Sequence, residues 1–210
     1  MLNGLATVEK KLPLVVVIDI LYLESKYEVS NDPLEIVSLR LYCFLFDQNQ
    51  TLDASTYIFP NIGPRVNRLF EQNLYERSSV PLGKSLVVGD LSFIHNSIVP
   101  ENLPTPEEIF AELARLNILD KTKLLKTTFL DISHAYLRPS QKNHTELRKL
   151  EQSISTIQNI HLIGRFGAGV YNNLDYAILS GFDLARWLVN TSATKIAVKR
   201  DWNNHHKIYN

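Results

Sequence analysis

The sequence has 210 residues, 45% of them apolar, and its 22 basic and 22 acidic residues give a formal net charge of zero. A chain of this length and composition can bury a sizeable core, which argues against an intrinsically disordered protein. The neutral balance gives no reason to expect a nucleic acid or an anionic membrane as partner.

The cysteine and histidine content and the hydropathy narrow the class of protein further. The single cysteine, Cys43, excludes an internal disulfide framework, and its apolar strand context predicts a buried, inert thiol. The apolar run 12–23 contains Asp19 and is too short to span a membrane, which needs about 20 residues. No signal peptide precedes it, so we expect a cytoplasmic protein. The histidines lack metal-ligand spacing apart from the adjacent pair His205 and His206, so no metal site is predicted.

Strand-like runs dominate the first half of the chain. β-branched and apolar residues predict strands over 14–23, 35–46, 54–59, 85–93 and 123–132. The polar segment 47–50 predicts that 35–46 and 54–59 form a hairpin. Alternation along 35–46 places Ile36, Ser38, Arg40, Tyr42 and Phe44 on one face, and we expect that face to line a cleft.

Three helices follow. Thr105 is a predicted N-cap, Pro106 the first helical residue and Glu108 the partner in a capping box. A second helix is predicted over about 145–157 from its apolar spacing. The third runs to about Val189 and is so apolar that we expect it to be largely buried. After it, residues 190–210 form a polar tail.

The segment before the third helix is the most informative part of the sequence. It predicts a short strand over 160–163, a glycine turn with the spacing G-x-x-G-x-G from Gly164, and a helix start near Asn172. Such a turn onto a helix N-terminus favours an anion or an electron-rich ring. Gly167 is expected to need positive φ or a close approach of the backbone to a ligand. Ordinary capping by Asn172 and Asp175 is the competing interpretation of those two residues.

Three further side chains are candidates outside this turn. Arg65 and Arg68 lie between two predicted strands. They are interpreted either as surface arginines or as guanidinium groups that bind a substrate carboxylate or phosphate. Tyr136 is either a packed aromatic residue or a ring that lines the cleft. Arg68 and Tyr136 are the two predicted substrate contacts.

The residues 164–181 resemble the C-terminal flavin-contacting motif of FAD-dependent amine-oxidase-like proteins, a superfamily that includes protoporphyrinogen oxidases and UDP-galactopyranose mutases. The pattern is G-R-[FY]-G…Y-N-N-x-D-x-[AS]-I, and here it begins at Gly164 and ends at Ile178. Upstream, 67–73 and 81–85 are similar to that branch's R-[IL]-x-E-x-[KN] and P-x-G-K-[ST] segments. Ala135 and Tyr136 match part of its A-Y-P segment, although Leu137 replaces the proline.

The resemblance implies that the last helix approaches the flavin ring edge and that the preceding strands form a substrate domain. It assigns eight cofactor-binding residues: Gly164, Arg165, Phe166, Gly167, Tyr171, Asn172, Asn173 and Asp175. The family holds the ADP part of FAD with a G-x-G-x-x-G unit, and this sequence contains none. We therefore expect FAD to bind only when a nucleotide-binding domain completes the chain.

Two hypotheses follow for the protein. In the first, it is the C-terminal part of an FAD-dependent oxidoreductase or mutase, inactive alone, whose partner is a missing N-terminal half, a separate subunit or a second copy. In the second, it is a non-catalytic binding module derived from such a flavoprotein. Both predict an α+β fold with a largely antiparallel sheet, flanking helices and a terminal strand–turn–helix unit. The predicted domains are 12–158 (substrate or cap), 159–189 (flavin contact) and 190–210 (tail).

Overall fold

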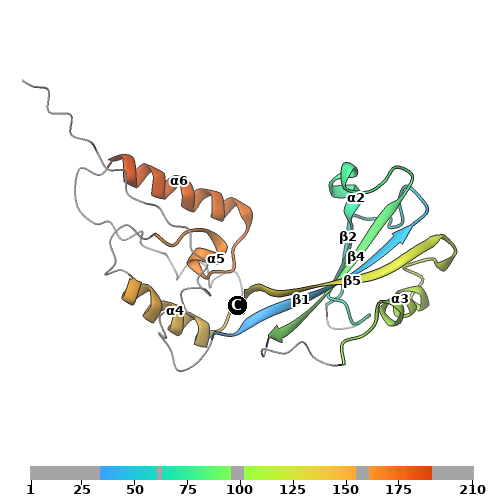
Figure 1. Ribbon diagram of the computed structural model, residues 1–210, viewed down its shortest axis with the longest axis horizontal. Helices are drawn as coiled ribbons and strands as arrows, with labels where there is room; N and C mark the ends of the chain where they lie inside the picture. The colour runs from blue at the N-terminus through green and yellow to red at the C-terminus, as the bar shows by residue number, and fades with distance from the viewer. Residues whose placement is uncertain (1–33, 61–62, 96–101, 155–160, 191–210) are drawn as a thin grey trace, which may run out of the picture. The chain divides into compact units, whose positions relative to one another are not determined.

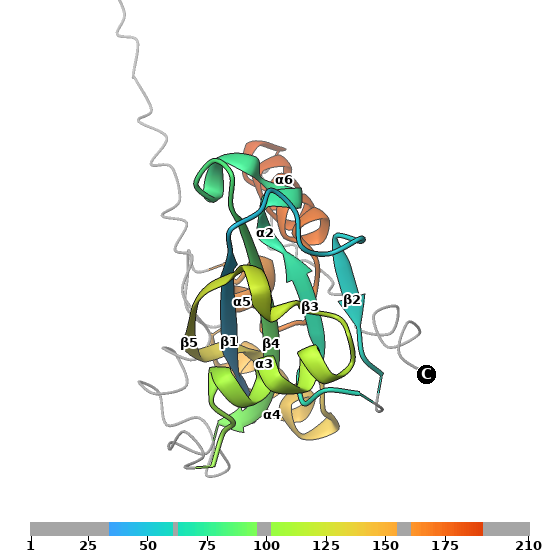
Figure 2. The same cartoon turned by 90° about the vertical axis from the view of Figure 1, so that its right-hand side faces the viewer.

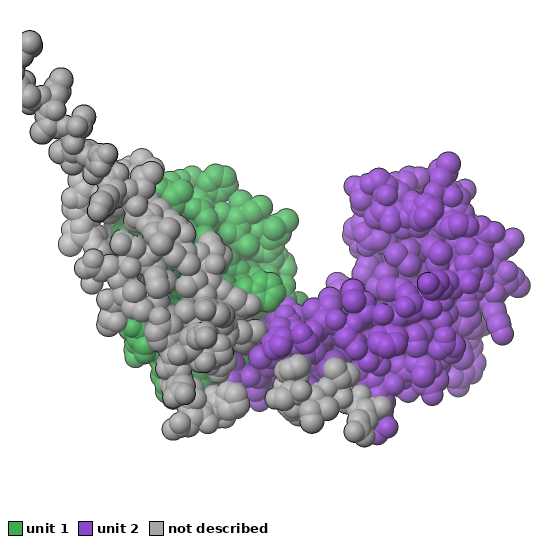
Figure 3. Space-filling view, viewed as in Figure 1, with its two compact units in different colours: residues 1–33, 141–210 green, residues 34–140 purple. Residues whose placement is uncertain are grey.

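The computed structural model of the protein describes residues 34–60, 63–95, 102–154 and 161–190. The chain divides into two compact units, coloured separately in Figure 3. Unit 2 comprises residues 34–140, and unit 1 comprises 1–33 together with 141–210. The expected strand 14–23 and the tail after residue 190 lie outside the described residues, and the predicted domain boundaries stay a prediction.

Unit 2 contains a five-stranded antiparallel sheet with the order β2-β3-β4-β1-β5 (Figure 1). Its strands are β1 (Ile36–Phe46), β2 (Thr56–Ile58), β3 (Arg68–Glu71), β4 (Ser85–His95) and β5 (Leu124–Leu137). Short helical segments join them: α2 (Gln72–Tyr75), η1 (Arg77–Ser79) and η2 (Lys121–Lys123). With the helices below, this sheet confirms the α+β class.

The predicted hairpin between the first two strands is wrong. β1 pairs with β4 on one side and β5 on the other, whereas β2 pairs with β3, a strand that the sequence pattern did not reveal. Three backbone N–H groups fix the direction of the chain after β1. The N–H of Asp47 donates to the carbonyl of Lys123 at 2.8 Å, and the N–H groups of Thr51 and Leu52 donate to Glu71 of β3.

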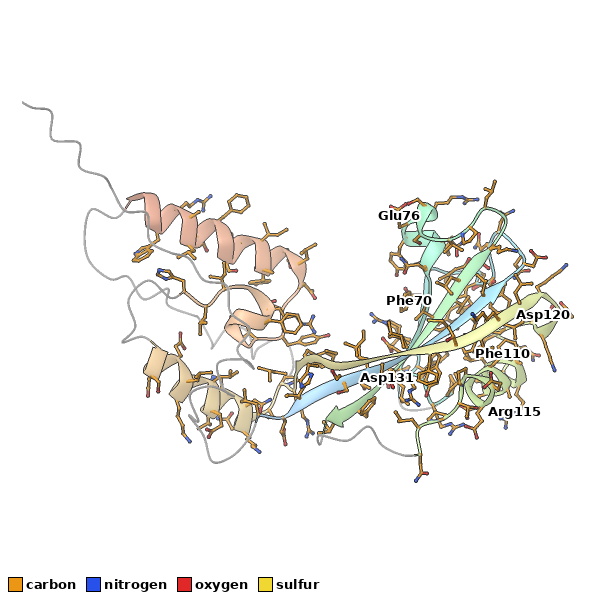
Figure 4. The ribbon with its side chains drawn as sticks, viewed as in Figure 1. Phe70, Glu76, Phe110, Arg115, Asp120 and Asp131 are labelled. Atoms are coloured by element: carbon orange, nitrogen blue, oxygen red, sulfur yellow. The ribbon has the colours of Figure 1, made fainter. Side chains whose placement is uncertain are left out.

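The core of unit 2 lies between the sheet and helix α3 (Pro106–Arg115), which crosses one sheet face in Figure 2. Tyr42, Phe44 and Phe46 of β1 are completely buried there. The ring of Phe110 on α3, labelled in Figure 4, lies 5.7 Å from that of Phe44 and 6.4 Å from that of Phe46 between centroids. Aromatic pairs at such distances add to the free energy gained by burial.

The β1 face that was expected to line a cleft is therefore the core face. The polar side chains on this face have hydrogen-bond partners within unit 2. The sequence pattern could not show those partners, so it indicated a cleft. The hydroxyl of Tyr42 donates to the carbonyl of Pro104 at 2.8 Å. Arg40 forms a bidentate pair with Asp131 at 2.7 and 2.8 Å and lies over the ring of Phe129. Hydrogen bonds to Asp131 raise the pKa of Arg40 above its ordinary value.

The start of α3 is as predicted. The N–H of Glu108 donates to the hydroxyl of Thr105, and the N–H of Thr105 donates to the carboxylate of Glu108, which completes the capping box. Pro106 occupies the first turn, where its missing N–H is not needed. The apolar stripe of Ile109, Phe110 and Leu113 then faces the sheet.

A buried polar network holds the loop between β1 and β2 against the sheet. Glu71 is completely buried, and its carboxylate accepts from the N–H groups of Thr51 (2.9 Å) and Leu52 (2.6 Å) and from the amide of Asn73 (2.9 Å). Asn73 in turn accepts from the N–H of Leu86 on β4 at 3.1 Å. The motif residues Glu71 and Asn73 therefore have a structural role within unit 2.

Unit 1 contributes three described helices, α4 (Gln141–Ile154), α5 (Gly164–Ala168) and α6 (Leu174–Asn190). α4 begins four residues before its predicted start. α6 matches its predicted end closely, but the expectation that it is largely buried is wrong. Leu184 is buried, while Leu174, Ile178 and Phe182 are 75%, 51% and 60% exposed, because only one side of the helix packs within the unit. In the described part of the chain, the helices are too short or too polar to cross a membrane.

Removing the Glu71 carboxylate tests the buried network. We expect Glu71→Ala to lower the free energy of unfolding by about 3 kcal/mol or more, since it leaves buried backbone donors without an acceptor. Glu107→Ala, at the exposed first turn of α3, is the matched control and should cost at most about 1 kcal/mol. Urea denaturation measures both. Equal costs for the two variants would show that the network adds nothing to stability.

Candidate functional site

The glycine segment of unit 1 forms a short helix rather than an open loop. α5 covers Gly164–Ala168 and follows extended backbone at Ile163. Residues 161–163 belong to no strand, so the short strand expected before the turn is not seen in the described residues. Gly164 and Gly169, at either end of α5, have φ values of 70° and 64°. The left-handed region that these values occupy favours glycine, so the two residues set the entry to and the exit from the turn.

Gly167 does not have the positive φ that the sequence led us to expect. It lies inside α5 and is buried, whereas the left-handed conformations belong to Gly164 and Gly169. In the G-x-x-G-x-G segment, the first and last glycines therefore have left-handed backbone conformations, and the central one lies in a helical turn. Sequence spacing alone could not tell these roles apart.

Ser180 of α6 fastens the turn to the long helix. The N–H of Gly164 donates to the Ser180 hydroxyl at 3.1 Å, and that hydroxyl donates to the carbonyl of Ala177 at 2.7 Å. The Ser180 hydroxyl therefore links the N-terminus of α5 to α6. Ser180 was not singled out from the sequence. Its only signal there is a small hydroxyl residue within the apolar stretch of that helix.

Arg165 and Tyr171 form the side-chain part of the site. The guanidinium carbon of Arg165 lies 4.3 Å from the centroid of the Tyr171 ring, a cation–π arrangement. The same guanidinium donates to the carbonyl of Asn172 at 3.4 Å. The rings of Tyr171 and Phe166 are both exposed. The Arg165 side chain therefore bridges the turn, and the rings of Phe166 and Tyr171 are partly exposed.

The first turn of α6 carries an acidic residue. The helix begins at Leu174, and the carbonyl of Asn173 accepts from the N–H of Ala177 at 3.1 Å, so Asn173 rather than Asn172 precedes the first turn. Asp175 lies within that turn, where a negative charge is favourable. The side-chain oxygen of Asn172 is buried and accepts no hydrogen bond in the described structure.

All eight predicted cofactor residues thus lie on one continuous stretch of unit 1, from α5 to the first turn of α6. The predicted substrate residues belong to unit 2. Arg68 on β3 forms an ion pair with Asp90 at 2.6 Å, and Arg65 forms one with Glu112 at 2.6 Å. Tyr136 lies on β5 and is half-buried. Both guanidinium groups have structural partners in unit 2, and the substrate contacts of Arg68 and Tyr136 stay predictions.

Other reactive groups add little to this site. Among the described residues, no cluster of three or more His, Cys, Asp and Glu side chains could hold a metal ion. Cys43 lies in β1, and burial raises the pKa of its thiol above the ordinary value, so its thiolate is scarce at neutral pH. The segment from Gly164 to Asp175 is therefore our candidate functional site. It combines two exposed aromatic rings, a buried side-chain oxygen without a hydrogen-bond partner among the described residues, and the N-terminus of α6.

Comparisons with known proteins agree with the sequence resemblance at the level of fold. No protein-family model matches the chain, and no curated protein matches it in sequence. Among solved structures it is similar to reduced UDP-galactopyranose mutase, with a TM-score of 0.65 and 16% identity over 84% of this chain and 40% of that one. It is also similar to a protein assigned as a protoporphyrinogen oxidase from Exiguobacterium sp. 255-15, with a TM-score of 0.55 and 10% identity. That match covers 84% of this chain and 41% of the other.

These are the two kinds of protein that the motif in residues 164–181 resembles. At such identities the likeness establishes the fold alone. The chain spans about 40% of the length of each neighbour, with values of 40% and 41%.

The left-handed glycine gives a test of the turn. A Cβ at Gly164 would meet no atom within 4 Å, so Gly164→Ala should cost only backbone strain, about 1–2 kcal/mol. Gly181→Ala in α6 is the matched control, because its added Cβ also meets open space but its φ is not positive. It should stabilise by up to about 1 kcal/mol.

Tryptophan fluorescence during urea denaturation measures both variants, because Trp187 and Trp202 belong to unit 1. Opposite signs for the two substitutions are the expected result. A neutral or stabilising Gly164→Ala would contradict the left-handed turn.

Proposed function

We propose that this chain is the substrate-domain and flavin-contacting portion of an FAD-dependent oxidoreductase or mutase, completed by a nucleotide-binding half. One observation carries the proposal. The motif in residues 164–181 and the fold of 84% of the chain lead independently to the same two kinds of protein. The fold covers about two fifths of each neighbour, as expected of one part of such an enzyme.

The candidate site fits the ring end of a flavin. The buried side-chain oxygen of Asn172 can accept a hydrogen bond from a ring N–H, and the exposed rings of Phe166 and Tyr171 offer planar contact surface. Gly164 leaves open space where any other residue would carry a Cβ. The flavin would supply the redox chemistry, and these residues would orient the ring and shape its surroundings.

The charges at the start of α6 favour a ring edge over a diphosphate. The helix dipole places a partial positive charge there, but Asp175 adds a full negative charge in the same turn. Arg165 contacts the Tyr171 ring and the Asn172 carbonyl, which hold its guanidinium against the turn. We therefore assign Gly164, Arg165, Phe166, Gly167, Tyr171, Asn172, Asn173 and Asp175 to the ring end of FAD.

The nucleotide end of FAD would need a partner. The eight glycines of this sequence include no G-x-G-x-x-G fingerprint, the usual cradle for a dinucleotide diphosphate. The exposed apolar residues of α6 offer a surface for docking: Leu174, Ile178, Leu179 and Phe182. Contiguous apolar surface of this kind is uncommon on soluble monomers and marks interaction sites. We propose that a nucleotide-binding half or subunit covers it, with self-association as the substitute when that partner is absent.

Flavin retention tests the proposal. The purified chain, mixed with FAD and passed through gel filtration, should emerge without flavin absorbance, because most contacts to the nucleotide are missing. The same chain purified by an affinity tag from its native cells should carry flavin together with a protein that contains G-x-G-x-x-G. Recovery of a partner without flavin would instead favour the non-catalytic binding module. A stable yellow preparation of the chain alone would contradict the need for a partner.

Asn172→Ala in the flavin-loaded complex tests the site itself. Loss of one hydrogen bond between neutral groups should weaken flavin retention by about twofold to tenfold. The matched control is Asn67→Ala, which makes the same truncation in unit 2, where the Asn67 amide donates to Ser92. Flavin release during stepwise dilution measures both. Equal release from the two variants would remove Asn172 from the flavin site.

A further inference from the structure

A second candidate site lies in unit 2. A cavity of about 230 Å³ opens between α2 and the segment that leads from η1 into β4. Its polar lining includes Asn49, Asn73, Arg77 and Lys84, and its apolar lining includes Val80 and Leu82. None of the lining residues is acidic.

The wall of the cavity is held in place from both sides. Residues 81–84 form a turn in which the N–H of Lys84 donates to the carbonyl of Pro81 at 3.1 Å, and Gly83 has a φ of 79°. Those values are typical of a type II turn with glycine at its third position. On the other side, Asn73 is fixed by the carboxylate of Glu71 and the N–H of Leu86. The backbone of the turn and the side chain of Asn73 are therefore fixed by contacts within unit 2.

Two cations line this wall, and neither is strongly neutralised. The guanidinium of Arg77 forms no hydrogen bond or ion pair with any described residue. Lys84 pairs with Asp47 at 3.0 Å, and the Asp47 side chain is 62% exposed. Exposed pairs of this kind contribute about 0–1 kcal/mol, so an arriving anion can displace Asp47 at little cost. The carboxylate of the neighbouring residue Glu76 accepts hydrogen bonds from the N–H and hydroxyl of Ser78 rather than from Arg77.

We propose that this cavity binds a small organic anion: a carboxylate or phosphate monoester on a short carbon skeleton. Arg77 and Lys84 pair with the anionic group, and the side-chain amide of Asn49 supplies a further donor. Val80 and Leu82 cover the carbon skeleton, and Leu82, which is almost fully exposed, gains most from that contact.

Size limits the ligand class. Cavities that hold drug-sized ligands measure about 300–1,000 Å³, and this one is smaller at about 230 Å³. It is too small for a dinucleotide such as FAD. The inference therefore does not depend on the proposed flavin contact and concerns a different ligand.

Titration of the whole chain with three probes tests the proposal. The probes are glycerol 3-phosphate, butyrate and inorganic phosphate, and the readout is amide chemical-shift change in two-dimensional NMR. We expect shifts centred on Ser78, Leu82, Gly83 and Lys84, with Kd values of about 1 mM or below for one or both organic anions. Inorganic phosphate, without a carbon skeleton, should bind more weakly than the organic anion that binds best.

Three variants and one control locate the binding. Arg77→Ala and Lys84→Ala should each weaken binding by about fivefold to tenfold. Leu82→Ser should weaken the organic anion but leave inorganic phosphate unchanged. Arg115→Ala removes the same charge from α3, which Figure 4 shows well apart from Glu76 beside the cavity, and should change nothing.

The spectra also show whether each variant is folded. The absence of localised shifts at probe concentrations about tenfold above 1 mM would overturn the proposal. So would binding that all four variants leave unchanged, or inorganic phosphate that binds as tightly as the best organic anion.

Discussion

Tyr42, Phe44 and Phe46 project from one face of β1 into the core beneath α3, and the packing of the Phe44 and Phe46 rings against Phe110 sets the rest of unit 2. β1 is bonded along both edges, to β4 and β5, so neither β2 nor any other strand can pair with it. The chain after Phe46 therefore has to pass over to β3, and the buried carboxylate of Glu71 receives its backbone donors there. The cavity that we assign to a small anion is lined by Asn73, which belongs to the same network.

Unit 1 differs from unit 2, because the residues of its candidate site lie close together in the sequence. Two left-handed glycines bound α5, Ser180 ties the turn to α6, and Arg165 closes the loop over Tyr171. These contacts join residues at most 16 positions apart. A site of this kind can be preserved in a chain that supplies only part of a cofactor's binding surface. The exposed apolar side of α6 is consistent with a unit that is completed by another surface.

Sequence patterns predicted local features well and long-range ones poorly. The start of α3 followed from Thr105, Pro106 and Glu108, because capping depends on neighbours within one turn. The span of β1 followed from its apolar run. Its partners did not, because periodicity carries no information about which strand lies alongside. The polar side chains of Arg40 and Tyr42 suggested a cleft, although Asp131 and Pro104 satisfy them. α5 was not predicted because its glycines disfavour a helix. The exposure of α6 was not predicted because an apolar composition indicates burial.

The central claim is that residues 164–175 contact the ring of a bound flavin. Hydrogen–deuterium exchange on the flavin-loaded complex, compared with the same complex after flavin removal, tests it most directly. Our account predicts that bound flavin slows exchange about tenfold or more at the amides from Gly164 to Asp175, while α3 of unit 2 is unchanged. Unchanged exchange across 164–175, with protection elsewhere in the chain, would contradict it.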